Sequence, residues 1–321
     1  FPFELGVFDQ FDIKYKTPES GEVKQITLKS LSKDENALRY RDRYSARLDS
    51  LTDFNFQDKY SFKRISPKTG LLNLRIFTMA SNADAPDFTT FSNYLDSLFR
   101  SFKEQDVQNL VIDIRNNPGG NDPTYEKVFT YLTDHSFREN TEAYILFNQL
   151  PYPQYYKWNS TDKSNQKREL KDLNAYFQTI FSVKKGKQYH QHPQFNPVYT
   201  PDSNRFNGTV YLLINEDVGS AASHFASLVR GHSDAVIVGV ETSGGYYGHN
   251  GHFPVEYVLP NSKITTRFSI VHVTQDAPQK SIQPIGRGII PDHVVTQSYA
   301  DFIHNEDTQM NYVLNLIEHS K

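Results

Sequence analysis

The segment from residue 210 to residue 230 constrains the fold more than any other part of the chain. Its first five residues, Val210-Tyr211-Leu212-Leu213-Ile214, form an apolar run of the length of a buried strand. A turn of small residues follows at 219–223, and apolar residues then recur at helical spacing over 225–229. A buried strand that runs through a tight turn into a helix is typical of a parallel sheet covered by helices.

The same alternation of strand and helix patterns extends over most of the chain. We therefore expect an α/β core over residues 66–321, with a mainly parallel sheet covered by helices. The expected strands are residues 71–77, 110–115, 143–147, 210–214 and 235–239, with further strands near 252–258 and 263–273; the expected helices are residues 87–105, 124–132 and 307–319.

Two segments stand apart from this alternation. Residues 1–65 are rich in strand patterns, and the turn signal Pro18-Glu19-Ser20-Gly21 predicts a hairpin between 11–16 and 23–28, followed by a charged surface helix and loop over 31–58. Residues 150–205 form a polar and aromatic insertion with a charged, helix-like part. An insertion of this length is either a solvated excursion or a cover over an active site, and the sequence favours neither.

Composition excludes several classes of function. The 321 residues carry a formal net charge of -3 without a basic stripe, so we expect no nucleic-acid partner. The absence of cysteine excludes disulfides, thiol catalysis and thiolate metal sites. No apolar run has the length of a membrane span. The two histidine pairs, His190 with His192 and His249 with His252, lack a spaced carboxylate on a helix, so we expect no metal site and no cofactor.

Ser220 is the strongest candidate for a catalytic residue. A turn between a buried strand and a helix can raise a serine hydroxyl out of the sheet, at the positive end of the helix dipole and beside free backbone N–H groups. A second turn, at Pro118-Gly119-Gly120-Asn121, follows the strand 110–115, and both turns should lie at the carboxyl edge of the sheet. We expect the N–H of Gly119 or Gly120 to pair with that of Ala221 in an oxyanion hole.

The order and spacing of four motifs resemble the C-terminal processing (tail-specific) and tricorn-type serine peptidases. Residues 110–120 are similar to the family's LVIDLRNNPGG signature, and residues 215–222 resemble its nucleophile turn. Residues 238–245 are similar to its strand and glycine hairpin, and Gly288-Ile289-Ile290-Pro291-Asp292 to its closing turn. The resemblance covers about residues 66–320.

This resemblance implies a ClpP/crotonase-like α/β core and a serine peptidase that hydrolyses peptide bonds in extended polypeptides through an acyl-enzyme on Ser220. It implies a tail-specific or tricorn-like endopeptidase outside the cytoplasm, in the periplasm or the extracellular space, that needs no cofactor. Ser223 stands where many relatives have an acid. The family's PDZ domain is not recognisable in residues 1–65, which are interpreted as a lost or reduced PDZ-like segment.

The general base is where this chain departs from the family pattern. Processing peptidases have a lysine in the hairpin after the nucleophile helix, but residues 244–252 contain none, and the first histidine of the chain is His135. Three hypotheses follow: the base precedes residue 1, which we favour; His249 or His252 replaces it; or the site is inactive. In the last case the chain would be a non-catalytic peptide-binding relative that kept the groove.

Overall fold

The computed structural model describes residues 8–17, 20–32, 34–35, 38–39, 59–80, 82–121 and 123–319. The chain divides into two compact units, Phe1–Asp58 and Lys59–Lys321. In the first unit, β1 (Gln10–Lys16) and β2 (Val23–Lys29) pair antiparallel, which confirms the predicted hairpin. Most of the helix and loop predicted over 31–58 lies outside the described residues.

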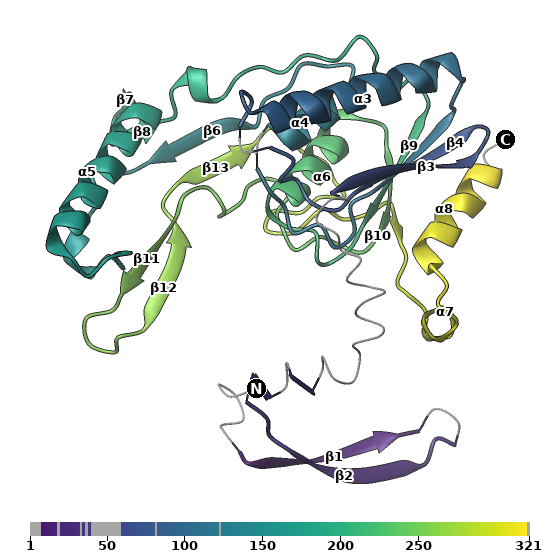
Figure 1. Cartoon of the computed structure of the whole chain (residues 1–321), viewed down its shortest axis with the longest axis horizontal. Helices are drawn as coiled ribbons and strands as arrows, with labels where there is room; N and C mark the ends of the chain where they lie inside the picture. The colour runs from purple at the N-terminus through teal and green to yellow at the C-terminus, as the bar shows by residue number, and fades with distance from the viewer. Residues whose placement is uncertain are drawn as a thin grey trace. The chain divides into compact units, whose positions relative to one another are not determined.

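The second unit is built on a six-stranded sheet in the order β14-β10-β9-β5-β4-β3 (Figure 1). All neighbours from β14 to β4 run parallel, and only the edge strand β3 is antiparallel to its partner. This is the predicted mainly parallel sheet. The strands are β3 (Tyr60–Ser66), β4 (Thr69–Leu74), β5 (Asn109–Asp113), β9 (Thr209–Ile214), β10 (Val236–Gly239) and β14 (His293–Val294).

Helices cover both faces of this sheet because its central strands are apolar on both sides. Along β9, Leu212 and Ile214 pack in the larger core with α3 (Pro86–Glu104), α4 (Thr124–Thr130) and α6 (Ser220–His232). The alternate residues Tyr211 and Leu213 pack against α8 (Thr308–His319) on the other face. The alternation of side chains along a strand thus accounts for the continuous apolar run in the sequence. The short helix α7 (Tyr299–His304) precedes α8.

Helix α3 shows why the local sequence folds as predicted. It begins at Pro86, where the missing N–H of proline costs nothing, and Asp87 in the first turn complements the helix dipole. Five apolar side chains at helical spacing are buried along one face: Phe91, Leu95, Leu98, Phe99 and Phe102.

The strand predicted at residues 143–147 lies in a different sheet from the one expected. β6 (Asn140–Ile145) pairs antiparallel with β13 (His272–Gln275) and β8 (Gln188–His190) in a second sheet that β7 (Val183–Lys185) completes. Only some of its residues are buried, whereas β9 is buried at every position after the first. A strand with one covered face suits an antiparallel sheet, so the strand and helix alternation alone could not place β6.

The inserted segment has its own ordered structure and small core. It contains η1 (Pro153–Tyr155), α5 (Lys163–Ile180), β7, β8 and η2 (Pro193–Phe195). Asp162 caps α5 by accepting hydrogen bonds of 2.9 Å from the N–H groups of Ser164 and Asn165. Phe177 of α5 packs with residues of β6 and β13, near the hairpin of β11 (Pro254–Val258) and β12 (Thr265–Ser269). Among the described helices, none is long and apolar enough to cross a membrane.

Candidate active site

Ser220 lies at the turn between β9 and α6 in an uncommon backbone conformation. It is the first residue of α6, its side chain is exposed, and its φ is +48°. A left-handed φ at a residue other than glycine costs about 1–3 kcal/mol and persists only where the surrounding structure holds it. This strain is an observed outlier, and outliers of this kind cluster at functional sites.

The predicted glycine turn packs directly against the serine turn. Gly119 has φ +112°, and a methyl group on it would lie 2.5 Å from Ser220 Cβ and 2.9 Å from Ala221 N. A methyl group on Gly120 would lie 2.2 Å from the main chain of Phe77. Both positions therefore require glycine, and the two motifs predicted to share one edge of the sheet meet at Ser220.

Asn117 holds the glycine turn in place. This fully buried side chain donates to the carbonyl of Leu74 (2.8 Å) and accepts from the N–H of Gly119 (2.9 Å). The main-chain carbonyl of Asn117 accepts a hydrogen bond of 3.2 Å from the N–H of Gly219, the residue before Ser220. One asparagine thus connects β4, the glycine turn and the serine turn.

These hydrogen bonds show which of the candidate oxyanion donors already has a partner. The N–H of Gly119 is already bonded to Asn117. The N–H groups of Gly120 and Ala221 donate to no described residue. Ala221 is the second residue of α6, where backbone N–H groups have no partner within the helix and the dipole favours negative charge. Gly120 and Ala221 are therefore the two candidates whose N–H groups are left for an oxyanion.

The other two motifs, residues 238–245 and 288–292, are tied by hydrogen bonds to the elements around Ser220. Asp292 accepts hydrogen bonds from Arg230 of α6 (2.7 Å) and from the N–H of Ile237 in β10 (2.8 Å). Glu241 pairs with Arg287 and accepts from the N–H of Gly288 (2.8 Å), and the Arg287 guanidinium lowers the pKa of the Glu241 carboxyl. The closing turn is thereby tied to the nucleophile helix and to the glycine hairpin.

Ser223 has a local structural role. Its Oγ donates to the carbonyl of Ser220 (2.7 Å) and so stabilises the first turn of α6. A methyl group on Gly244 would lie 1.9 Å from this Oγ, so the glycine hairpin also requires a bare backbone where it approaches the helix.

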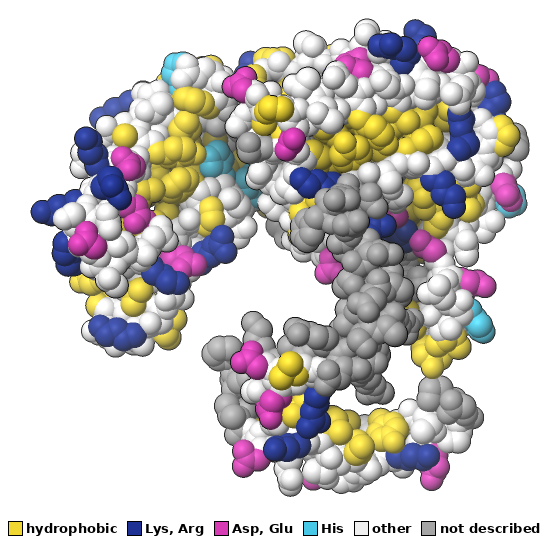
Figure 2. All heavy atoms as spheres, viewed as in Figure 1, with side chains coloured by type: hydrophobic (Ala, Val, Ile, Leu, Met, Phe, Trp, Pro, Cys, Tyr) yellow, Lys and Arg dark blue, Asp and Glu magenta, His cyan; other side chains and the backbone are white. Residues whose placement is uncertain are grey.

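A cavity of about 390 Å³ opens beside Ser220. Gly120 and Ala221 contribute to its wall, together with His224, His249 and His252. Apolar side chains from the inserted segment and from the residue before β11 complete it, namely Tyr176, Ile180, Phe195 and Phe253. Figure 2 shows histidine and apolar side chains gathered in the hollow between the α5 region and the main sheet.

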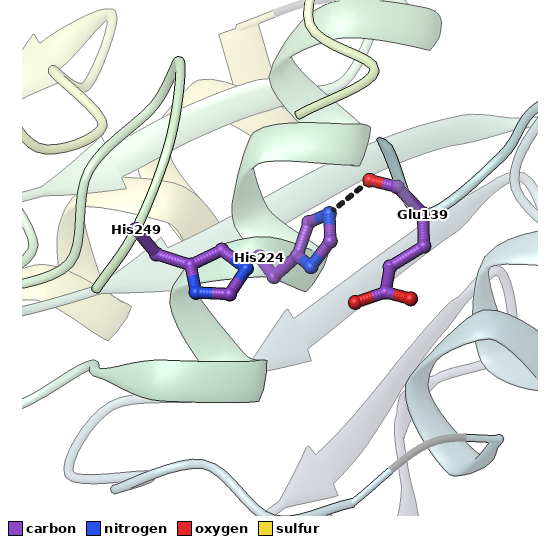
Figure 3. A group of neighbouring side chains, drawn as sticks. All are labelled: Glu139, His224 and His249. Carbon is purple, nitrogen blue, oxygen red and sulfur yellow. Dashed lines mark hydrogen bonds between the residues drawn. The ribbon is translucent and has the colours of Figure 1, made fainter. Parts of the chain in front are cut away.

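His224 is buried and both of its ring nitrogens have hydrogen-bond partners. Nε2 lies 2.7 Å from the main-chain carbonyl of Glu139, so it carries the proton, and Nδ1 lies 3.1 Å from the hydroxyl of Tyr125 (Figure 3). Burial, with a smaller effect of nearby His249, lowers the pKa of His224 to about 3. His224 is therefore neutral at physiological pH, with no nitrogen available to Ser220 in this arrangement.

His249 is the candidate base whose ring lines the cavity with an unpaired nitrogen. Its Nε2 is buried and has no hydrogen-bond partner within the described ranges. Nδ1 accepts a hydrogen bond of 3.2 Å from the N–H of Gly251, and burial lowers the pKa of the ring. His252 lies nearby, and burial, with a smaller effect of His249, lowers its pKa to about 4. Both rings are thus held in the neutral form that a base requires.

The Oγ of Ser220 forms no hydrogen bond with a described histidine. The three hypotheses about the base therefore stay open. Of the other two histidines considered in the sequence, His190 lies in β8 and His192 precedes η2, and neither lines the cavity.

Among the cavity residues that sequence reasoning missed are His224 and Glu139. His224 follows Ser220 by four positions, a spacing that places two residues on the same face of a helix, so the helix pattern could have indicated it. Glu139 lies just before β6 and joins the site through the packing of the second sheet, which no local pattern reveals.

Comparison with known proteins identifies the family. The model of peptidase family S41 matches residues 68–295, and the chain belongs to this family. This confirms the resemblance to the processing and tricorn-type peptidases at the level of the family. No curated protein sequence matches the chain.

The chain is similar to several solved structures at low sequence identity. A putative peptidase from Parabacteroides merdae is 21% identical with a TM-score of 0.50, over 80% of this chain and 64% of that one. A putative S41 protease from Bacteroides fragilis is 16% identical with a TM-score of 0.45, over 97% and 66%. The photosystem II D1 C-terminal processing protease is 16% identical with a TM-score of 0.39, over 89% of this chain and 55% of that one. The chain therefore spans less than two thirds of the length of each.

Proposed function

We propose that this protein is a serine-type endopeptidase that cleaves extended polypeptides through an acyl-enzyme on Ser220. The observation that carries the proposal is the contact of Gly119 with Ser220, where a methyl group would lie 2.5 Å from Ser220 Cβ. This contact places an exposed serine with left-handed φ beside two backbone N–H groups without partners among the described residues. A nucleophile and an oxyanion hole require this combination, and packing alone does not.

The reaction follows from this geometry. Ser220 Oγ attacks the peptide carbonyl while a base takes its proton, and the N–H groups of Gly120 and Ala221 stabilise the negative oxygen of the tetrahedral intermediate. The protonated base then donates to the leaving amine, which departs and leaves an ester on Ser220. Water, deprotonated by the same base, attacks this ester and regenerates the serine. No step requires a cofactor.

Within the described chain, His249 is the base that the arrangement supports best. It lines the same cavity as Ser220, and its buried Nε2 is without a partner there. For Nε2 to accept a proton, the ring proton must lie on Nδ1, which gives up the 3.2 Å hydrogen bond from Gly251. One such hydrogen bond contributes about 1 kcal/mol, so this change of tautomer is accessible. His224 would have to give up two hydrogen bonds, of 2.7 and 3.1 Å.

The cavity suggests the substrate. Tyr176, Phe195 and Phe253 provide an apolar wall next to Ser220, which favours an apolar side chain beside the cleaved bond. Tail-specific cleavage and a location in the periplasm or outside the cell are the parts of this proposal that rest on family resemblance alone.

Active-site labelling tests the proposal. A fluorophosphonate probe should label the protein, and the label should be lost in Ser220→Ala. His249→Ala should reduce the labelling rate at least about 100-fold, as expected for loss of a general base, whereas His192→Ala, outside the cavity, should label like the wild type. Equal labelling of the wild type and Ser220→Ala would refute the assignment of the nucleophile.

One observation favours a second function. Because Ser220 Oγ has no hydrogen bond to a described histidine, the chain would also suit a peptide-binding protein without catalysis. In that case the folded protein would bind unfolded peptide but would not react with the probe. Binding of a fluorescent apolar peptide, measured by anisotropy next to the labelling, separates the two functions.

A further inference from the structure

Three side chains beside Ser220 form a group of the metal-ligand type. Glu139 precedes β6, His224 lies on α6, and His249 lies in the glycine hairpin (Figure 3). One carboxylate oxygen and one nitrogen of each ring all lie within 4.8 Å of one another. Around a tetrahedral zinc ion with bonds of about 2.0–2.2 Å, donor atoms stand about 3.5 Å apart. Movements of about 1 Å would therefore bring these three donors onto an ion.

His224 already makes the outer hydrogen bond that metal-binding histidines usually make. Its Nε2 donates to the main-chain carbonyl of Glu139 at 2.7 Å, which fixes the ring and leaves the lone pair on Nδ1. In Figure 3 this second nitrogen and the Glu139 carboxylate lie on the same side of that hydrogen bond. Nδ1 now lies 3.1 Å from the Tyr125 hydroxyl. A bond to a metal ion is much stronger than this hydrogen bond, so the exchange is favourable.

His249 supplies an independent indication of a ligand. Its Nε2 is buried in the cavity wall without a partner in the described part of the chain. Buried polar atoms in native proteins are nearly always paired, so such an atom calls for a partner. That partner is a water molecule or, once the ring proton lies on Nδ1 and the 3.2 Å hydrogen bond from Gly251 is given up, an ion. The ring centroids of His224 and His249 are 5.6 Å apart, so both rings reach one ion.

The surroundings favour a divalent ion with an open coordination position. Two imidazoles and one carboxylate are donor groups that divalent transition metal ions accept, and their ligand atoms lie together in the cavity wall. Two histidines and one carboxylate fill three of the four positions that zinc prefers. The cavity of about 390 Å³ provides the path for entry and the space for the fourth ligand.

We propose that Glu139, His224 and His249 bind a divalent transition metal ion of the zinc type, whose fourth coordination position faces the cavity that contains Ser220. The proposal differs from the expectation of no metal, which rested on histidine spacing along the sequence. It also has a regulatory consequence, which rests on the proposed function. An ion that holds Nε2 of His249 removes the base, so zinc and acylation of Ser220 exclude each other.

Calorimetry on the full chain, stripped of metal by a chelator, tests the site directly. Titration with zinc chloride should show one ion per chain in the wild type and in the control His192→Ala. Binding should be weakened at least about 100-fold in His249→Ala and in Glu139→Gln. Cobalt chloride should give the visible absorption of a tetrahedral Co²⁺ site, lost in the same two variants. Because His224 is buried, His224→Ala is interpreted only if its circular dichroism matches the wild type.

Two results would overturn the site: no binding of zinc by the wild type, or equal binding by the wild type, His249→Ala and Glu139→Gln. The regulatory consequence has its own test. Zinc should slow fluorophosphonate labelling of the wild type at least about 10-fold, and a chelator should restore it; unchanged labelling with the site occupied would overturn this coupling. A wild type that is never labelled would count against the proposed function, whereas calorimetry would still decide the metal site.

Discussion

Asn116 and Asn215 exchange two hydrogen bonds across the carboxyl edge of the sheet, each 2.8 Å long. The N–H of Asn116 donates to Oδ1 of Asn215, and Nδ2 of Asn215 donates to Oδ1 of Asn116. Asn116 follows β5 and Asn215 follows β9, and these two strands are parallel neighbours. The pair therefore joins the two turns that carry the proposed nucleophile, Ser220, and the proposed oxyanion donor, Gly120.

Removing this pair of hydrogen bonds should lower the stability of the folded protein modestly. Asn215→Ala removes both hydrogen bonds at a partly exposed position, so we expect a loss of about 1 kcal/mol in the free energy of unfolding. Asn116 has φ +61°, so Asn116→Gly is the matched change that keeps its backbone conformation. In a double-mutant cycle by urea unfolding, the two changes should couple by about 0.5–1.5 kcal/mol. Strict additivity would show that the pair contributes nothing.

Gly119→Ala should abolish most of the activity. The new methyl group would lie 2.5 Å from Ser220 Cβ and 2.9 Å from Ala221 N, so the turns must separate. Since this displaces oxyanion donors, we expect the rate of peptide cleavage to fall about 100-fold or more. Gly186→Ala is the control, because Gly186 also has a left-handed φ, +60°, but no atom within 4 Å of the added methyl group. Equal activity of the two variants would contradict this explanation.

Asn117→Ala should be more destabilising than the change at Asn215. The side chain is fully buried, and its loss leaves the carbonyl of Leu74 and the N–H of Gly119 without their partner. An unpaired buried polar group costs about 1–3 kcal/mol, so we expect a loss of about 2–4 kcal/mol in chemical unfolding. A loss below about 1 kcal/mol would mean that water replaces the side chain.

Much of the fold follows from periodicity. The apolar runs at β5 and β9 are buried on both faces, and α3 buries one regular stripe, so each pattern corresponds to its observed environment. β6 could not be placed in this way because its partner strands, β8 and β13, come from later parts of the chain. Strand pairing over such separations depends on tertiary packing, which a local pattern does not record.

The site was predictable to a similar extent. Ser220, Gly119, Gly120 and Ala221 follow strands of one parallel sheet, so their meeting at its carboxyl edge is a consequence of topology. His249 lines the cavity, as one of the hypotheses required. Glu139 and the cavity wall from α5 depend on how the second sheet and the insertion pack. The hydrogen bond from Gly119 to Asn117, which leaves Gly120 as the candidate glycine donor, is a detail of turn geometry.

The partly buried His252 should make stability depend on pH in the acid range. Burial, and to a smaller degree His249, lowers its pKa to about 4, below the value of about 6.5 expected in the unfolded chain. The unfolded state therefore binds the proton first, so the stabilisation is complete above pH of about 6.5 and is lost as the pH falls towards 4. The shift corresponds to at most about 3 kcal/mol.

Urea unfolding in the presence of a chelator, at pH 7.5 and pH 4.5, measures this contribution. The difference in stability between the two pH values should be smaller in His252→Gln than in the wild type. His272→Gln, at an exposed position in β13, should retain the wild-type difference. An unchanged pH dependence in His252→Gln would show that His252 is solvated in the folded protein.

At position 220, the residue that the proposed reaction requires is not the residue that would give the highest thermal stability. Glycine adopts φ +48° without the steric cost that serine bears there, so Ser220→Gly should melt at a higher temperature than the natural chain. Selection for thermal resistance alone would therefore discard the hydroxyl. A serine at this position is what the proposed reaction requires and what stability alone would not favour.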